Sequence, residues 1–222
     1  MFTVSFIGSK GGCGKTTSAI GLAVAATRAG RVVALIDLDP QATAANWKDR
    51  RGEESPAVVS AQASRLRQTL DAARSGGAEL VIIDTAGRND DSALNAARLS
   101  DLVLIPSKAV VVELETLGKV HDLIRVAGNP PSFVLLNRIE PGATKQFDDA
   151  RGMVERAFGL RVCPFFLSQL RAYENALETG RAAQELDPKG KTAAELESLY
   201  LFTCELVKNG DREHGKESAS RA

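Results

Sequence analysis

Hydrophobic positions along the chain gather in short runs rich in Val, Ile and Leu, and each run is bounded by Gly, Pro, Asp or Asn. Brief continuous runs of this kind are typical of strands that are buried on both faces of a parallel sheet. We therefore predict strands at residues 3–8, 32–37, 80–84, 102–106 and 133–137, with weaker candidates at 57–60 and 161–163.

Between these runs, apolar residues recur at helical spacing, and Leu114, Leu117 and Val120 fall on one face of a segment. Helices are expected at residues 15–29, 62–74, 113–127, 145–158, 170–178 and 193–208. Strand–helix alternation predicts one α/β domain, a twisted and mostly parallel sheet with helices on both faces. We expect this domain to span residues 1–208 and the polar segment 209–222 to be a disordered tail.

Composition narrows the classes of protein that fit. The chain has 28 Lys and Arg against 28 Asp and Glu, so a surface that is basic throughout is excluded, although a local basic patch is not. Cys13, Cys163 and Cys204 lie far apart and lack metal-ligand spacing, which argues against a disulfide framework or a structural zinc site. No run approaches the ~20 apolar residues of a membrane span, and no cleavable leader is evident. We expect a soluble, cytoplasmic protein.

The strongest chemical signal is SKGGCGKTT at residues 9–17, directly after the first expected strand and at the start of the first helix. Glycines let successive backbone N–H groups point at phosphate oxygens, and the helix N-terminus adds positive charge. Lys15 can reach the β- and γ-phosphates, and the Thr16 hydroxyl can bind Mg²⁺. A flexible loop with a solvated lysine is the alternative, but it does not explain two lysines five positions apart. The expected nucleotide-binding residues here are Lys10, Gly11, Gly12, Cys13, Gly14, Lys15, Thr16 and Thr17.

The pattern KGGxGKTT, with its additional Lys10, resembles the deviant Walker A motif of the ParA/MinD family of ATPases. The resemblance implies a P-loop NTPase fold of about seven or eight strands, with ATP and Mg²⁺ as cofactors. It also implies an ATP-dependent homodimer in which Lys10 of each subunit contacts the phosphates bound by its partner.

Two further segments resemble the switch regions of that family, ALIDLDPQ at 34–41 and LVIIDTAG at 80–87. The resemblance implies that Asp39 orients the attacking water and that Asp37 lies near the metal. It implies that Asp84 holds Mg²⁺ through water and that Gly87 lets its loop follow the γ-phosphate. The expected catalytic residues are thus Lys10, Lys15 and Asp39, and the expected metal-binding residues are Thr16, Asp37 and Asp84.

The resemblance extends into the C-terminal half. LLNR at 135–138 resembles the strand whose Asn and Arg flank adenine, which implies base contacts from Asn137 and Arg138. VCPF at 162–165 resembles the loop that closes over the base, which implies a contact from Pro164. Two segments depart from the pattern, residues 88–91 and 107–110, and they leave the identity of the partner open.

The chain looks most like the short ParA type, in which no helix-turn-helix precedes the first strand. That implies a cytoplasmic, nucleoid-associated ATPase that partitions plasmid or chromosomal DNA. It would bind double-stranded DNA without sequence preference, and a ParB-like or other small DNA-binding partner would stimulate its slow hydrolysis. Candidate DNA contacts, for which ordinary solvated helix faces are the alternative, are Arg171, Arg181, Lys189 and Lys191.

Two alternatives stay open: a related ATPase that positions a protein cargo, and a nucleotide switch with negligible turnover. Other relatives fit less well. A membrane-binding MinD would need an amphipathic C-terminal helix, whereas the segment after Leu206 has acids and no aromatic residue. A relative of the nitrogenase iron protein would need cluster-bridging cysteines. A bacterial tyrosine kinase would need a tyrosine-rich tail, and this chain has only Tyr173 and Tyr200.

Overall fold

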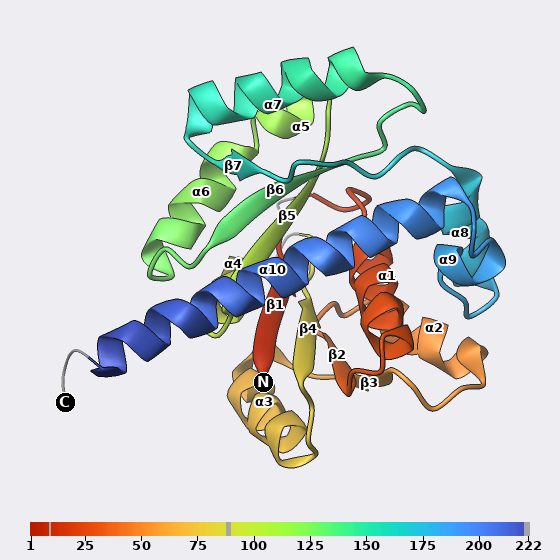
Figure 1. The fold of residues 1–222 in the computed structure, drawn as a ribbon, viewed down its shortest axis with the longest axis vertical. Coiled ribbons are helices and arrows are strands. Elements are labelled where there is room, and N and C mark those ends of the chain that lie inside the picture. The colour runs from red at the N-terminus through yellow and green to blue at the C-terminus, as the bar shows by residue number, and fades with distance from the viewer. Residues whose placement is uncertain (9, 88–89, 220–222) are drawn as a thin grey trace.

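The structure is a computed structural model, and it describes residues 1–8, 10–87 and 90–219. Ser9 of the glycine-rich motif and the pair Arg88–Asn89 lie outside the described residues. A central sheet is covered by helices on both faces, as Figure 1 shows, and the long last helix runs across one of them. The expected single α/β domain is thus confirmed.

All strand pairings in the described residues are parallel, and the seven strands have the order β3-β2-β4-β1-β5-β6-β7. The strands are β1 (Phe2–Phe6), β2 (Val33–Asp37), β3 (Ala57–Ser60), β4 (Leu80–Asp84), β5 (Leu102–Lys108), β6 (Ser132–Asn137) and β7 (Arg161–Val162). Every strand expected from the hydrophobic runs is present, with bounds that differ by at most two residues.

Successive residues of the central strands enter two separate cores. Leu35 and Ile82 pack into the core on one face, whereas Ile36 and Ile83 pack into the core on the other. Both positions of each pair are buried, which explains why the strands have continuous apolar sequences. The cores thus fix the sheet between two helical layers.

Helices α1, α2, α8, α9 and α10 cover the first core, and α3 to α7 cover the second. Their bounds are α1 (Lys15–Arg28), α2 (Thr43–Arg51), α3 (Leu66–Ser75) after a 3-10 turn (Ala63–Arg65), α4 (Asp90–Arg98), α5 (Val111–Leu114), α6 (Leu117–Val126), α7 (Thr144–Phe158), α8 (Arg171–Glu178), α9 (Ala183–Leu186) and α10 (Lys191–Ala219).

One expected helix, at 113–127, is instead two, α5 and α6. At the break, the Thr116 N–H donates to Glu113 O over 3.1 Å and the Thr116 hydroxyl donates to the same oxygen over 2.7 Å. A Thr hydroxyl that competes for a backbone carbonyl disfavours regular helix. The carbonyl of Val112, which would accept from residue 116 in a continuous helix, is thereby left for another donor.

The expected disordered tail differs from the structure. Helix α10 continues without interruption through residue 219, so the segment from residue 209 to 219 is helical. Residues 191–219 contain no Pro, which would end the helix, and the helix continues although Gly210 and Gly215 have low helix propensity. The C-terminal part of α10 extends beyond the body of the domain in Figure 1.

Candidate functional site

The glycine-rich loop joins the end of β1 to α1 at the middle of the sheet. Gly12 and Gly14 have φ angles of 73° and 96°, in the left-handed region that favours glycine. A side chain at Gly14 would also begin 1.9 Å from Nδ2 of Asn137. The loop therefore needs glycine both for its turn and for the close approach of β6.

The two lysines of the motif point to different elements. Lys15 is buried, with 6% of its surface exposed, and its Nζ donates to Lys10 O over 3.0 Å. Lys10 Nζ instead donates over 3.0 Å to the carbonyl of Val112 in α5. Lys15 thus lies inside the loop, where the expected phosphates would sit, whereas the Lys10 ammonium lies toward the neighbouring helix. Sequence patterns gave no sign of the Val112 contact, because the acceptor is a backbone carbonyl.

Cys13 is buried within the loop, and its thiol donates to Lys10 O over 3.3 Å. Burial raises the pKa of this thiol, and the charge of Lys15 only partly opposes the rise. The Cys13 carbonyl accepts a hydrogen bond from Nδ2 of Asn137 over 2.9 Å. Cys13 therefore helps to shape the loop as a protonated thiol.

Asp84 and Asp37 are paired in register at the C-terminal ends of β4 and β2. Burial raises the pKa of Asp84 to about 7, and the charges of Asp37 and Asp39 add to the rise, while Thr16 and Lys15 oppose it. The Thr16 side chain is thus close to Asp84, yet neither oxygen of this fully buried carboxylate accepts a well-formed hydrogen bond from a described residue. Buried polar atoms are normally paired, so these oxygens are available to a ligand. Hydroxyl and carboxylate oxygens are the donors that Mg²⁺ prefers.

Asp37, expected near the metal, is engaged in holding the backbone. One of its oxygens accepts from the Asp39 N–H over 3.0 Å, and the other accepts from Ala44 and Ala45 over 2.9 and 3.2 Å. Burial raises the pKa of Asp37 while these three hydrogen bonds oppose the rise. The carboxylate thus caps the first turn of α2. Sequence analysis missed this role because it did not predict α2.

Asp39, the expected water-positioning residue, lies half-buried in the turn after β2. One of its carboxylate oxygens accepts the Gln41 N–H over 2.9 Å, and the backbone carbonyl of Asp39 accepts from Ala42 over 2.8 Å. Its charge also contributes to the raised pKa of Asp84. The structure therefore brings Asp37, Asp39 and Asp84 to one edge of the sheet, as the sequence predicts.

Gly87 brings the second switch segment against the glycine-rich loop. A side chain at this position would begin 2.8 Å from the backbone of Lys10 and Gly11. Just before it, the Thr85 hydroxyl donates to Phe6 O over 2.8 Å, which joins the end of β4 to the end of β1. The glycine-rich loop and the chain that follows Asp84 are therefore packed directly against each other.

The expected base-binding residues lie at the end of β6 and on the segment after β7. Arg138 has a φ of 56°, and its guanidinium lies 3.7 Å from Glu174 of α8. Residues 163–167 run beside β6, since Cys163 N donates to Val134 O and Leu167 N donates to Leu136 O. Pro164 is exposed between these two anchors. The structure thus brings Asn137, Arg138 and the Pro164 segment to neighbouring strands.

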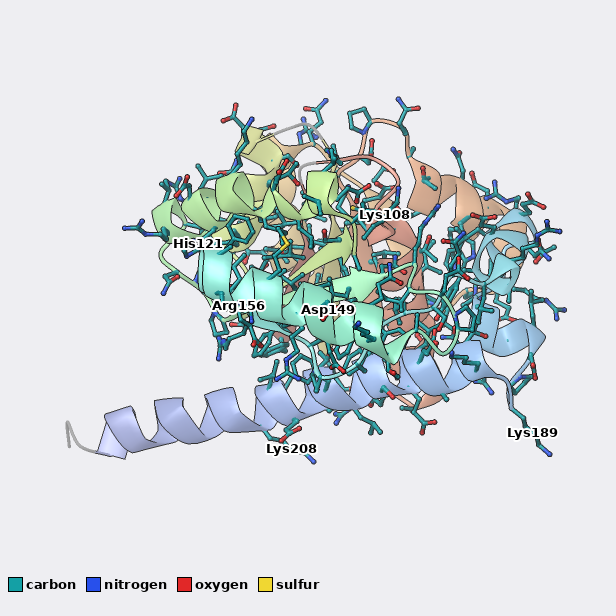
Figure 2. The ribbon with its side chains drawn as sticks, turned by 90° about the horizontal axis from the view of Figure 1, so that it is seen from above. Lys108, His121, Asp149, Arg156, Lys189 and Lys208 are labelled. Atoms are coloured by element: carbon teal, nitrogen blue, oxygen red, sulfur yellow. The ribbon has the colours of Figure 1, made fainter. Side chains whose placement is uncertain are left out.

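The four candidate DNA contacts are exposed and come from one end of the domain. Arg171 begins α8, Arg181 lies between α8 and α9, and Lys189 and Lys191 lie just before and at the start of α10. Figure 1 shows α8 and α9 together beside the start of α10, and Figure 2 shows Lys189 pointing away from the body at this end. Acidic residues such as Glu178 and Asp187 lie among them, so the surface is mixed in charge.

The backbone around Arg181 is held by contacts that the sequence did not reveal. Nε1 of the buried Trp47 donates to Arg181 O over 2.9 Å, and Arg51 forms a two-pronged ion pair with Glu185 at 2.8 and 2.7 Å. Helix α2, which Asp37 caps, is therefore held against the turn between α8 and α9.

Within the part of the chain that the structure describes, no helix is long and apolar enough to cross a membrane.

Comparisons with known proteins identify the family of this chain. A family model described as "CobQ/CobB/MinD/ParA nucleotide binding domain" matches residues 4–182. "Maintenance of carboxysome distribution protein A" of Gloeobacter kilaueensis is 32% identical over 204 residues, which cover 91% of this chain and 92% of that protein.

Solved structures of low identity share the fold. The MinC:MinD cell division complex of Aquifex aeolicus gives a TM-score of 0.76 at 15% identity, covering 92% of this chain and 96% of the other. The ATP complex of a Cyanothece McdA variant gives 0.68 at 18% identity, covering 94% and 96%. Because the family model matches residues 4–182, which is most of this chain, the chain belongs to the CobQ/CobB/MinD/ParA family and is an ATPase of the ParA/MinD type.

Proposed function

We propose that this chain binds Mg²⁺–ATP in the loop of residues 10–17, forms an ATP-dependent homodimer and uses slow hydrolysis to position a large cargo. The observation that carries the proposal is Asp84, a fully buried carboxylate near Lys15 and Thr16 whose oxygens accept no well-formed hydrogen bond from a described residue. A buried carboxylate without partners is costly, and a bound cation removes that cost.

Thr16 and Asp84 would hold Mg²⁺, Asp84 through a water molecule. The bound ion would supply positive charge to the phosphate oxygens as negative charge redistributes during transfer. Lys15 would neutralise the phosphates from within the loop, and the N–H groups of residues 11–17 would hold their oxygens. Asp39 would orient the attacking water with its half-buried carboxylate. Asp37 would act indirectly, because its oxygens hold the start of α2.

Lys10 would complete the site of the partner subunit. Its ammonium lies on the outer side of the loop and bonds to Val112 of α5, so it does not duplicate the position of Lys15. Exposed apolar side chains adjoin it, since Val111 and Val112 are 58% and 66% exposed. A surface that combines this lysine with valines suits contact with a second copy of the chain.

We favour a protein assembly as the cargo. Nucleoid DNA would be the surface that the ATPase binds while it positions this cargo. The similarity to a protein named for carboxysome distribution supports a protein cargo over the plasmid or chromosome that the sequence first suggested. The exposed basic residues at the end formed by α8, α9 and the start of α10 would bind DNA phosphates without sequence preference. A ParB-like or other small partner protein would stimulate hydrolysis and release the dimer.

Sedimentation and phosphate release, measured on the same samples, test the ATP cycle. The wild type should dimerise with Mg²⁺–ATP and release phosphate slowly. Lys10→Ala should bind ATP but stay monomeric, and Asp39→Ala should stay dimeric while its turnover falls about a hundredfold. ATP-driven dimers of Lys10→Ala would refute the role of Lys10. Dimers of wild type without measurable turnover would instead indicate a nucleotide switch.

A mobility-shift series tests DNA binding. The ATP-bound chain should retard duplex DNA of any sequence, and raising the salt about fourfold should weaken binding at least tenfold. Arg171→Ala and Arg181→Ala together should weaken it further, whereas Arg125→Ala, an exposed change on α6, should not. Equal binding with ADP, or no dependence on salt, would contradict the proposed binding of DNA.

A further inference from the structure

Glu195 of α10 is hydrogen-bonded to the segment that follows Pro164 and to α8. These contacts lie on the base side of the site, which is the region around Asn137 and the Pro164 segment. Glu195 is 10% exposed, and its oxygens accept the Ser168 N–H over 2.9 Å, the Ser168 hydroxyl over 2.5 Å and the Tyr173 hydroxyl over 2.7 Å. Lys191 lies 3.9 Å away on the more exposed side. None of these groups belongs to the glycine-rich loop or to the switch segments, so Glu195 has no part in the chemistry proposed above.

Ser168 belongs to the segment that follows Pro164. Ser168 forms an isolated parallel bridge with Ile139, and Gln169 N donates to Ile139 O over 2.8 Å. The bridge lies two residues after Asn137, the last residue of β6. The Pro164 segment is therefore held between the end of β6 on one side and Glu195 on the other.

The chemistry of the three donors explains why an acid stands at this position. Two hydroxyls and one backbone N–H, drawn from the loop and from α8, converge on one side chain, and only a carboxylate offers enough acceptor sites for all three. Burial and the neighbouring Glu195 raise the pKa of Tyr173, so its hydroxyl stays a donor. Removing the carboxylate would leave buried donors without partners.

We propose that Glu195 is a positioning residue for nucleotide recognition, which sets the Pro164 segment relative to Asn137 and thereby governs affinity for the base. The proposal rests on the proposed binding of ATP, with its base beside Asn137 and the Pro164 segment, and it adds a determinant that lies on the last helix, away from the phosphates. A determinant of this kind affects ligands that carry a base and spares ligands that consist of phosphate alone.

Calorimetry of the full chain with two ligands, ATP and inorganic triphosphate, tests this assignment in the presence of Mg²⁺. Glu195→Gln loses the charge and one acceptor oxygen, and it should weaken ATP binding about tenfold while leaving triphosphate binding unchanged. Glu205→Gln, a change on an exposed position of the same helix, is the matched control and should alter neither affinity.

Ser168→Ala keeps the backbone hydrogen bond to Glu195 and removes only the hydroxyl. It therefore tests the same contact with less risk to folding. It should weaken ATP binding about threefold, again without an effect on triphosphate. Equal losses for both ligands, or unchanged ATP affinity in folded Glu195→Gln and Ser168→Ala, would overturn the assignment. A wild type that binds neither ligand would overturn the proposed function itself, whereas equal wild-type affinity for both would overturn only the base-side role.

Discussion

The proposed phosphate side of the site, residues 10–17, and its proposed base side, around Asn137 and the Pro164 segment, are built in different ways. On the phosphate side, residues 10–17 are contiguous, and their shape comes from backbone angles at Gly12 and Gly14. On the base side, Asn137, Ser168 and Glu195 come from distant parts of the chain. Two hydrogen bonds join Ser168 to Glu195, and the backbone bridge of Ser168 with Ile139 brings both beside the end of β6. A local backbone shape leaves a sequence motif, whereas a set of distant hydrogen bonds does not.

A hydrogen bond joins the two sides. Asn137 Nδ2 donates to Cys13 O, and these residues are 124 positions apart. Base-side rearrangements can therefore reach the glycine-rich loop through β6. Three kinds of variant test this comparison. One disables the phosphate side, one removes the buried carboxylate at the sheet edge, and one breaks the hydrogen bond between the two sides.

The largest effect on ligand affinity should come from the phosphate side. Lys15→Ala removes the buried ammonium that faces the phosphates, so ATP affinity should fall at least about a hundredfold, and triphosphate affinity should fall with it. Calorimetry with both ligands measures the change, and Lys119→Ala on an exposed position of α6 is the control. ATP affinity retained within about threefold would refute the assignment of the phosphate site.

The next effect concerns stability against pH. The folded pKa of Asp84 is about 7 against an ordinary value of 3.8, so the folded state binds more protons between these values and the free energy of unfolding falls as pH rises through that range. At about 1.4 kcal/mol per pH unit, the loss is about 4 kcal/mol for the nucleotide-free protein. The side chain of Asp84→Asn does not titrate, so this variant should not lose stability in this way.

Urea unfolding without Mg²⁺ or nucleotide, at pH 4.5 and at pH 8, measures that difference. The stability of Asp84→Asn relative to wild type should rise by a few kcal/mol between the two conditions. Asp71→Asn, an exposed change, should show no such trend. If the difference in stability between Asp84→Asn and wild type does not change with pH, burial does not raise the pKa of Asp84.

The smallest effect should come from the connection between the two sides. Asn137→Ala leaves the Cys13 carbonyl without its partner in a buried position, which costs about 1–3 kcal/mol of stability. Urea unfolding at pH 8 measures the loss, with the exposed Asn175→Ala of α8 as the control. Stability equal to that of the control would mean that the two sides are joined elsewhere.

Much of the fold could be predicted because both faces of the sheet are buried, so each strand is a continuous apolar run. Helix α2 escaped prediction since only Ala44 and Trp47 of its nine residues are buried, which leaves no clear period. Helix α4 buries the small residues Ala93, Ala96 and Ala97, whose apolar signal is weak. Missing α2 also hid the capping role of Asp37, because a cap is recognised only with its helix.

The candidate site could be predicted from sequence motifs on its phosphate side and only in part on its base side, where short motifs indicated Asn137, Arg138 and Pro164 but not Glu195. The lysines, glycines and aspartates of the phosphate side stand in compact motifs. Glu195 stands in an ordinary amphipathic helix, and nothing in its local sequence separates it from the exposed Glu197 or Glu205. Its partners Ser168 and Tyr173 become visible only when the chain is folded, so a single sequence cannot assign it.

The position of β1 in the sheet bears on the order in which this protein is made. Strand β1 is synthesised first, yet its partners are β4 and β5, which end at residues 84 and 108. The glycine-rich loop also accepts a hydrogen bond from Asn137, which is made later still. A nascent chain therefore carries its nucleotide-binding motif in unfinished form until more than half of the protein has left the ribosome, and fragments that end before β6 should not capture ATP.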